Sequence, residues 1–192
     1  MKSLRWILAL IVAMPLLSSC SYNTMVEKRE TVDAQWAQVE NVYQRRADLI
    51  PNLVNTVKGY ASHERETLEG VIEARSKATS VNINAENMDA KTFQQFQQAQ
   101  DGLSSALSRL MVVVEKYPDL KANENFRDLQ SQLEGTENRI TVERMKFNEA
   151  TRGYNTYISK FPKNLIASMF SFERKPYFEA AAGASEAPVV EF

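Results

Sequence analysis

The sequence has a single cysteine, Cys20, and a single histidine, His63, and these two scarcities exclude several kinds of site. One thiol cannot form an internal disulfide, and one histidine cannot supply the paired histidines of the common zinc-protease motif. His63 stands in the stretch ASHE, off the apolar face of its predicted helix, and no Gly-x-Ser-x-Gly motif indicates a serine nucleophile. We therefore expect no catalytic residue, no metal site and no cofactor.

Glycine and proline are also scarce, with six of each in 192 residues, and the charge is nearly balanced. Few turn-forming residues favour long helices over a sheet with many turns. The 23 Lys and Arg residues are outnumbered by 24 Asp and Glu residues, so the chain lacks the basic excess that nucleic-acid binding requires. We therefore expect one helical domain and no nucleic-acid partner.

No apolar run is long enough for a membrane-spanning helix. The longest extends from Trp6 to Leu17 after the cations Lys2 and Arg5, whereas about 20 apolar residues are needed to cross a bilayer. A charged start, an apolar middle and small residues after it are typical of a secretory signal. The stretch LLSSC, residues 16–20, resembles the lipobox of bacterial lipoproteins, whose signal is cleaved before the cysteine.

The lipobox predicts that residues 1–19 are a signal peptide, that Cys20 carries the acyl chains and that residues 20–24 form a short tether. Several acyl chains are needed because one chain of myristoyl length binds a membrane only weakly. Removal of the signal leaves a formal charge of −3. Ser21, rather than Asp, follows Cys20, and the sorting rule of Gram-negative lipoproteins then predicts the periplasmic face of the outer membrane. The alternatives are an ordinary signal peptide with a chance cysteine and an uncleaved N-terminal anchor.

Apolar residues recur at steps of three and four along four segments, which predicts four amphipathic helices. The stripes extend over residues 25–43, 49–72, 93–114 and 126–158. Short connections between such helices predict an all-α fold, an antiparallel up-down-up-down four-helix bundle over residues 25–178. Residues 179–192 lack an apolar stripe and are expected to be disordered.

The ends of these helices are also predicted. Asp89 and Asn123 are expected to cap the third and fourth helices, and residues 79–88 to form a loop. Asp48 as a cap and Pro51 in a first helical turn predict a chain reversal near residues 46–49. One kinked helix that passes through Pro51 is the alternative.

Four stretches carry long, distinctive motifs: QRRADLIPNLVNTVKGYASHERETLEGVIEAR (44–75), YPDLKANENF (117–126), ENRITVERMKFNEATRGYN (137–155) and FPKNLIA (161–167). With these motifs the chain resembles the LemA family over most of its mature length. The resemblance implies an antiparallel helical bundle outside the cytoplasmic membrane and no established enzymatic activity. Most members have an uncleaved N-terminal transmembrane helix, in place of which this chain has a lipobox. Met145 and Phe147 also differ from the residues usual in the family.

Several charged and amide residues fall on or beside the apolar stripes, where a buried charge needs a partner. Glu64 and Arg75 are eleven residues apart, about 16 Å along a helix, so their partners must come from other helices. We expect an interhelical polar network with a Glu64–Arg144 pair as the leading candidate, and a polar binding groove is the alternative. The expected members are Arg29, Glu64, Arg75, Arg144, Asn148 and Asn155.

Residues 161–178, FPKNLIASMFSFERKPYF, combine many aromatic residues with scattered cations. An up-down-up-down order returns this segment to the end of the bundle that holds Cys20, so we expect it close to the bilayer. Contact with lipid headgroups is one use for such a composition, and cover for the lower end of the core is the other. The candidate membrane-proximal residues are Phe161, Phe170, Phe172, Tyr177 and Phe178.

These features favour a lipid-tethered, non-enzymatic helical protein that serves other envelope proteins as a scaffold or accessory subunit. Its predicted partners are the membrane, through acyl chains on Cys20, and unidentified envelope proteins. The alternative is a periplasmic small-ligand binder or a carboxylate-dependent hydrolase, for which Glu64 and Glu137 are a candidate pair. The hydrolase alternative requires these two carboxylates to converge at an open cleft.

Overall fold

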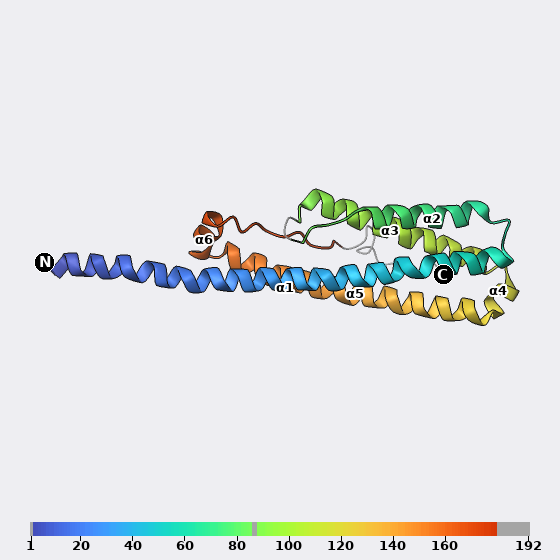
Figure 1. Cartoon of the computed structure of the whole chain (residues 1–192), viewed down its shortest axis with the longest axis horizontal. Helices are drawn as coiled ribbons and strands as arrows, with labels where there is room; N and C mark the ends of the chain where they lie inside the picture. Colours follow the sequence, from blue (N-terminus) through green and yellow to red (C-terminus); the bar gives the residue numbers. More distant parts are fainter. Residues whose placement is uncertain (1, 86–87, 180–192) are drawn as a thin grey trace, which may run out of the picture.

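The computed structural model describes residues 2–85 and 88–179, with the side chains of residues 21–85 and 88–179. Within these ranges the chain forms helices and no strand, which confirms the predicted all-α class. Six helices are present in the described chain (Figure 1): α1 (Lys2–Tyr60), α2 (Arg65–Ser80), α3 (Ala90–Val114), α4 (Pro118–Ala122), α5 (Glu124–Ser159) and α6 (Lys163–Met169).

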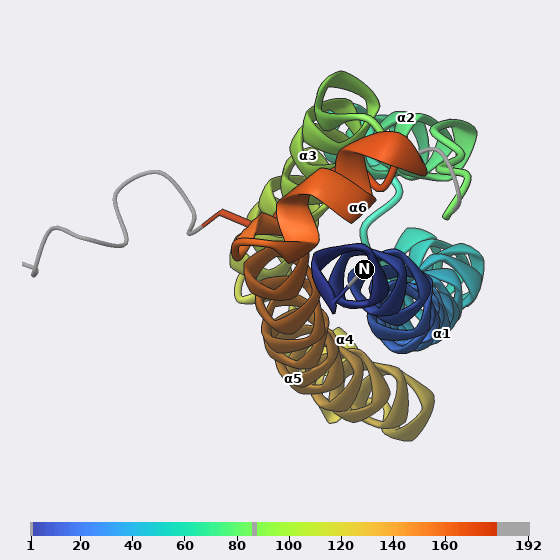
Figure 2. The same cartoon turned by 90° about the vertical axis from the view of Figure 1, so that its left-hand side faces the viewer.

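The long helices form two pairs of unequal length. α1 packs along α5, α2 packs along α3, and α2 also lies against α1 (Figures 1 and 2). The α2–α3 pair covers only the part of α1 that is distant from the N-terminus, whereas α5 follows α1 back towards that terminus. The helices are therefore less regular than four equal members of a simple bundle.

The chain reversal predicted near residues 46–49 is wrong, and a single helix passes through Pro51. α1 continues to Tyr60, and a turn at residues 61–64 leads into α2. Asp48, expected to cap a new helix, instead accepts a hydrogen bond from Gln44 within α1 at 2.7 Å. The helix continues because buried apolar residues recur without interruption on both sides of the proline, at Val39, Tyr43, Ile50, Leu53 and Val57.

Both predicted helix caps are confirmed. The backbone N–H of Thr92 donates to Asp89 Oδ1 at 2.8 Å, and that of Phe126 donates to Asn123 Oδ1 at 2.9 Å. Each bond satisfies one of the N–H groups that the first helical turn leaves without a partner. The loop predicted for residues 79–88 begins slightly later, because α2 extends to Ser80.

Two apolar clusters make up the core. The first, which we call the aromatic cluster, surrounds Trp36, whose ring lies 5.3–6.1 Å from four phenylalanine rings, those of Phe93, Phe96, Phe147 and Phe178. The second, the aliphatic cluster, lies nearer the α1–α2 turn and includes Ile50, Leu53, Val57, Val71, Leu103, Leu107, Leu110 and Leu133. Burial of these side chains is the main favourable contribution to folding.

The predicted signal and lipid-attachment segment stands at the start of α1. Residues 2–20 are helical, but the side chain of Cys20 lies outside the described residues. Among the residues described, no helix combines the length and apolar character needed to cross a bilayer. The predicted disordered tail lies outside the described residues from residue 180 onward. Its first residue, Glu179, is held by hydrogen bonds to Gln97.

Candidate functional site

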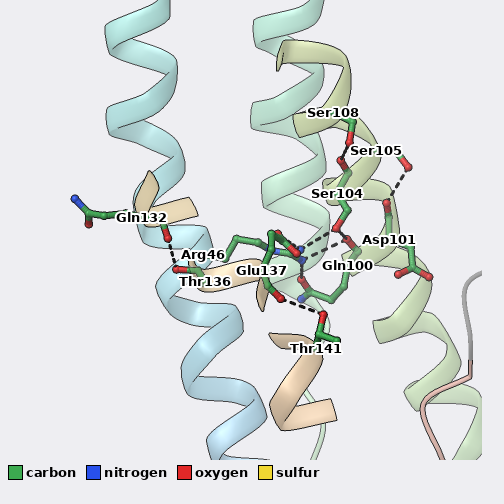
Figure 3. A network of polar contacts seen from close by, with 10 residues as sticks. All are labelled: Arg46, Gln100, Asp101, Ser104, Ser105, Ser108, Gln132, Thr136, Glu137 and Thr141. Carbon is green, nitrogen blue, oxygen red and sulfur yellow. Dashed lines mark hydrogen bonds and ion pairs between the residues drawn. The ribbon is translucent and has the colours of Figure 1, made fainter. Parts of the chain in front are cut away.

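Arg46 lies at the centre of a polar network between the long helices (Figure 3). Its side chain is only 1% exposed, so its charge needs partners inside the protein. Nη1 donates to Glu137 Oε1 at 2.7 Å and to Ser104 Oγ at 2.8 Å. Nη2 donates to the backbone carbonyl and the side-chain oxygen of Gln100. The guanidinium group thus connects α1 with α3 and α5.

Gln100 extends this network to α2. Its Nε2 donates to the Ala78 carbonyl at 3.1 Å, while its side-chain oxygen accepts from Arg46. The side-chain amide therefore uses both its donor and its acceptor inside the core, as a buried amide should. Through these bonds one connected set of polar groups contacts all four long helices.

Buried polar residues, which we call the polar layer, separate the aromatic cluster from the aliphatic cluster. The layer includes Arg46, Gln100 and Thr136. On each of three helices a buried polar residue stands between one member of each cluster: Tyr43, Arg46 and Ile50 in α1; Phe96, Gln100 and Leu103 in α3; Ile140, Thr136 and Leu133 in α5. Sliding any of these helices by one turn would place a polar group against apolar side chains. Buried polar groups are known to fix helix register in this way, so this polar layer specifies the alignment of the helices.

A groove opens beside the polar layer, between α3 and α5, with a volume of about 490 Å³. Leu107, Met111 and Leu133 supply its apolar lining. Its polar lining residues are Ser104, Ser108, Gln130, Glu134, Glu137 and Asn138. Two of the described lining residues are carboxylates and none is cationic, so the groove is suited to an apolar ligand or partner that carries positive charge.

The segment after α6, residues 172–179, runs back along the bundle without regular secondary structure (Figure 1). We call it the C-terminal strap. Asn155 Nδ2 donates to the Lys175 carbonyl at 2.8 Å, and its Oδ1 accepts from the Lys175 N–H at 2.9 Å. Asn148 makes the same two bonds with Phe178, each at 2.9 Å. Two amide side chains of α5 therefore bind the strap backbone.

The distance between the two asparagines along α5 matches the distance between the two strap residues that they bind. Asn148 and Asn155 are seven residues apart on α5, about 10.5 Å along its axis. Phe178 and Lys175 are three residues apart, which corresponds to about 10 Å of extended chain. Gln97 of α3 repeats the pattern with Glu179. The two asparagines were predicted as part of an interhelical network, and their partner is instead a segment without regular structure.

The predicted pair between Glu64 and Arg144 is wrong. Glu64 lies at the start of α2 and accepts a hydrogen bond from the Tyr117 hydroxyl at 3.1 Å. Arg144 lies over the Phe178 ring, with Cζ 4.6 Å from the ring centroid, and donates to the Glu179 carbonyl. The two residues are separated because the chain reversal lies at residues 61–64, which places Glu64 at the far end of the molecule.

The other two predicted charges also lie apart from each other. Arg75 of α2 donates from Nε to the Ala47 carbonyl of α1 at 2.7 Å. Arg29 lies over the Phe172 ring at 5.4 Å, and its nearest carboxylate, that of Glu30, is 3.9 Å away. The six predicted residues thus serve several separate contacts, and the connected network is built from other residues.

The burial of Arg46 and Gln100 could have been predicted from the apolar stripes, but only with the correct helix boundaries. Arg46 continues the series Trp36, Val39 and Tyr43 at a step of three, so it falls on the apolar stripe of an unbroken α1. A reversal at residues 46–49 removes it from that stripe. Gln100 likewise stands on the buried stripe of α3. Polar residues on a continuous apolar stripe were therefore the informative feature.

The aromatic residues of the C-terminal segment divide into two groups. Phe172 and Phe178 are buried, and Phe178 belongs to the aromatic cluster, so these two are not available to a lipid surface and the prediction fails for them. Phe161, Phe170 and Tyr177 are exposed. Phe178 is buried because the hydrogen bonds between the strap and α5 place its ring beside Trp36.

A second buried charge comes from the strap itself. Lys175 donates from Nζ to the Ala85 carbonyl and lies 3.4 Å from Asp33 Oδ1 in α1. Burial raises the pKa of the Asp33 carboxyl above its ordinary value, and the positive charge of Lys175 opposes that rise. The strap therefore supplies the counter-charge for a partly buried carboxylate of α1.

Glu64 and Glu137 do not converge at a cleft. Glu137 contacts Arg46, whereas Glu64 contacts Tyr117 beyond the end of α1, roughly 20 Å along the helix axis from Arg46. Paired carboxylates of glycoside hydrolases lie within about 10 Å of each other. The hydrolase alternative that uses this pair is therefore wrong. In the described part of the chain, His, Asp and Glu side chains form no group of three that could hold a metal ion.

Comparison with known proteins shows the family of the chain. The family model of the LemA family matches residues 35–192. The chain belongs to the LemA family. "Magnetosome protein MamQ 2" of Paramagnetospirillum magneticum is 28% identical over 186 residues, an alignment that covers 88% of this chain and 68% of that protein. "Protein LemA" of Metamycoplasma hominis is 21% identical over 159 residues, which cover 83% of this chain and 69% of that protein.

Proposed function

We propose that this LemA-family chain is a lipid-anchored protein of the bacterial cell envelope that binds another envelope protein and performs no catalysis. The open groove between α3 and α5 is the observation that carries the interaction role. In this proposal the four long helices act as an up-down-up-down bundle that holds the groove in shape. The lipobox motif at residues 16–20 supports anchoring through Cys20 and a position facing the periplasm, at the outer membrane.

The partner best suited to the groove is an amphipathic helix with basic residues beside its apolar row. Met111, which is half-buried, offers apolar contact above the buried Leu107 and Leu133, and helix-in-groove binding depends on such contacts. Glu134 is exposed and Glu137 is 40% exposed, so both carboxylates face an incoming basic group. Glu137 is also held in place by Arg46. A preorganised rim of this kind lowers the entropy lost on binding.

Site-specific crosslinking in intact cells tests the groove. A photoreactive residue at Met111 or Glu134 should form an adduct with one protein, and the crosslinked segment of that protein should be helical and basic. The matched control is the same residue at Ile72, which is exposed on α2 outside the groove lining. Glu134→Lys should abolish the adduct formed at Met111. Equal adducts at all three positions, or none at the groove positions, would contradict the proposal.

Anchoring is tested separately by metabolic labelling with an alkyne fatty acid. The wild-type chain should carry the label and sediment with outer membranes, and Cys20→Ala should lose the label. An unlabelled wild-type chain would contradict the lipid anchor but leave the groove proposal intact.

Small-ligand binding is a second candidate function. The groove volume of about 490 Å³ falls within the range of ligand pockets, and hydroxyl and amide groups line it beside apolar carbons. A small cationic amphiphile retained by the purified native protein, and released by Glu134→Lys, would favour this function over protein binding.

A further inference from the structure

The short helix α6 closes one end of the molecule. Figure 2, viewed from the end at which the N-terminus lies, shows α6 crosswise in front of the long helices. The N-terminal part of α1 passes beside it and projects beyond it (Figure 1). Attachment on the part of α1 that lies beside α6 would therefore bring α6 to the surface.

α6 and its flanks expose large apolar side chains. Phe161, Leu165 and Met169 are 80%, 59% and 75% exposed, and Phe170 is 53% exposed. Leu165 and Met169 are one turn apart on α6 and lie on the same face, while Phe161 and Phe170 flank the helix. Ile166 and Ala167 lie on the inner side, packed against the aromatic cluster. We call the four exposed residues the α6 patch.

Cationic residues flank the α6 patch in the sequence. Lys160 and Arg174 are exposed, and Lys163 is half-buried with its Nζ 3.7 Å from the centroid of the Tyr157 ring. Lys28 of α1 lies over the same ring at 5.6 Å. Residues 160–175 contain one acidic residue, Glu173. Apolar side chains bordered by Lys and Arg are the composition of helices that lie in the plane of a bilayer interface.

The predicted lipid-attachment site, Cys20, lies at the same level along the molecule as α6. The Tyr22 ring is 4.9 Å from the Phe170 ring and 5.6 Å from the Phe172 ring. Cys20 precedes Tyr22 by two residues, about 3 Å along α1. Acyl chains on Cys20 would thus enter a bilayer whose surface is level with α6.

We infer that the α6 patch inserts into the headgroup region of a leaflet that contains anionic lipids, and that it holds the bundle upright on the membrane. This inference rests on the proposed anchoring, because the anchor sets which end meets the bilayer. It adds a second point of contact, and two contacts fix the orientation of the bundle, which acyl chains on one residue do not. The groove between α3 and α5 then opens sideways, parallel to the membrane plane, towards a partner in the periplasm.

Quenching by brominated lipids tests the contact. The mature lipidated chain, from which signal cleavage has removed Trp6, is placed in vesicles of phosphatidylethanolamine and brominated phosphatidylglycerol, so that Trp36, which is buried, is the other tryptophan. Leu165→Trp should be quenched by the bromine atoms. The matched control is Val112→Trp, an exposed position in the last turn of α3, and it should show no quenching. α3 ends beside α4, at the end of the bundle opposite α6 (Figure 1).

Flotation of the same vesicles separates this inference from the proposed anchor. If the chain floats with the vesicles but Leu165→Trp is quenched no more than Val112→Trp, the inference is overturned while the anchor stands. If quenching persists and Cys20→Ala floats as well as the parent, the contact stands and the acyl anchor fails. If the chain does not float at all, both are overturned. Unchanged helical circular dichroism in each variant shows that the bundle remains folded.

Discussion

Arg75 of α2 donates a hydrogen bond to the backbone carbonyl of Ala47 in α1, with Nε 2.7 Å from the oxygen. Ala47 is the residue four positions before Pro51, so its carbonyl is the one that the missing N–H of proline leaves without a helical partner. Ala47 is buried, and water cannot easily replace that partner. A side chain from a neighbouring helix thus supplies the donor that allows α1 to continue through a proline.

The first prediction concerns this bond. Arg75→Met should destabilise the fold by about 1–3 kcal/mol, because it leaves a buried carbonyl without a donor. Methionine keeps the length and flexibility of the side chain, so the loss reports on the hydrogen bond more than on packing. The free energy of unfolding in urea, compared with that of the wild-type chain, measures the effect.

Pro51→Ala supplies the control for that prediction. Alanine at position 51 restores the backbone N–H, so Arg75→Met in this background should cost about 1 kcal/mol less than in the wild-type background. The loss of stability in the double variant is therefore smaller than the sum of the two single losses. Additive effects of the two substitutions would show that Arg75 does not replace the missing donor.

The second prediction concerns the counter-ion of Arg46. Glu137→Gln keeps the shape of the side chain but leaves the guanidinium buried without a negative partner, and should destabilise the fold by about 1–3 kcal/mol. Glu134→Gln, one turn earlier on α5 and exposed, should change stability by no more than about 0.5 kcal/mol. Chemical denaturation of the two variants in parallel measures the difference.

Replacement of both members of the pair has a different expected result. Arg46→Met with Glu137→Gln removes the buried charge together with its partner, and such exchanges are often neutral in stability. The double variant should therefore unfold at a higher urea concentration than Glu137→Gln alone. The polar layer also sets helix register, so a broader unfolding transition in the double variant is expected. A double variant less stable than either single variant would refute this account of the layer.

The third prediction concerns the C-terminal strap. Asn155→Ala removes two hydrogen bonds and leaves the buried N–H and carbonyl of Lys175 unsatisfied, so a loss of about 2 kcal/mol or more is expected. The strap should then detach more often, and trypsin should cleave after Arg174 faster than in the wild-type chain. Asn138→Ala, on an exposed position of the same helix, should leave the cleavage rate unchanged. Equal cleavage of all three proteins would count against the strap contacts.

The strap shows what local sequence patterns can and cannot predict. Asp89 and Asn123 were predicted as caps because a cap contacts the backbone three residues away, and the relevant residues are adjacent in sequence. Asn148 contacts Phe178, thirty residues later, so no local pattern contains this pair. The apolar stripes were predictable from helical periodicity, but Pro51 misled the prediction because the compensating donor, Arg75, comes from another helix.

The last prediction concerns pH. Burial raises the pKa of Asp33 above its ordinary value of 3.8, so the folded state binds more protons than the unfolded state between that value and the folded pKa. Stability contributed by this group is therefore present below about pH 4 and is lost as the pH rises through the folded pKa. Lys175→Met removes the opposing positive charge, so it should raise the pKa further and steepen that loss.

Urea denaturation of the wild-type and Lys175→Met proteins from acidic to neutral pH tests whether stability falls as the pH rises. The difference in stability between the two proteins should grow with pH, since the ionised Asp33 has lost its counter-charge. Loss of the bond to the Ala85 carbonyl lowers stability equally at every pH and does not affect the slope. In an Asp33→Asn background the pH dependence of the Lys175→Met effect should become smaller. Parallel pH curves for the wild-type and Lys175→Met proteins would mean that the strap lysine does not act on Asp33.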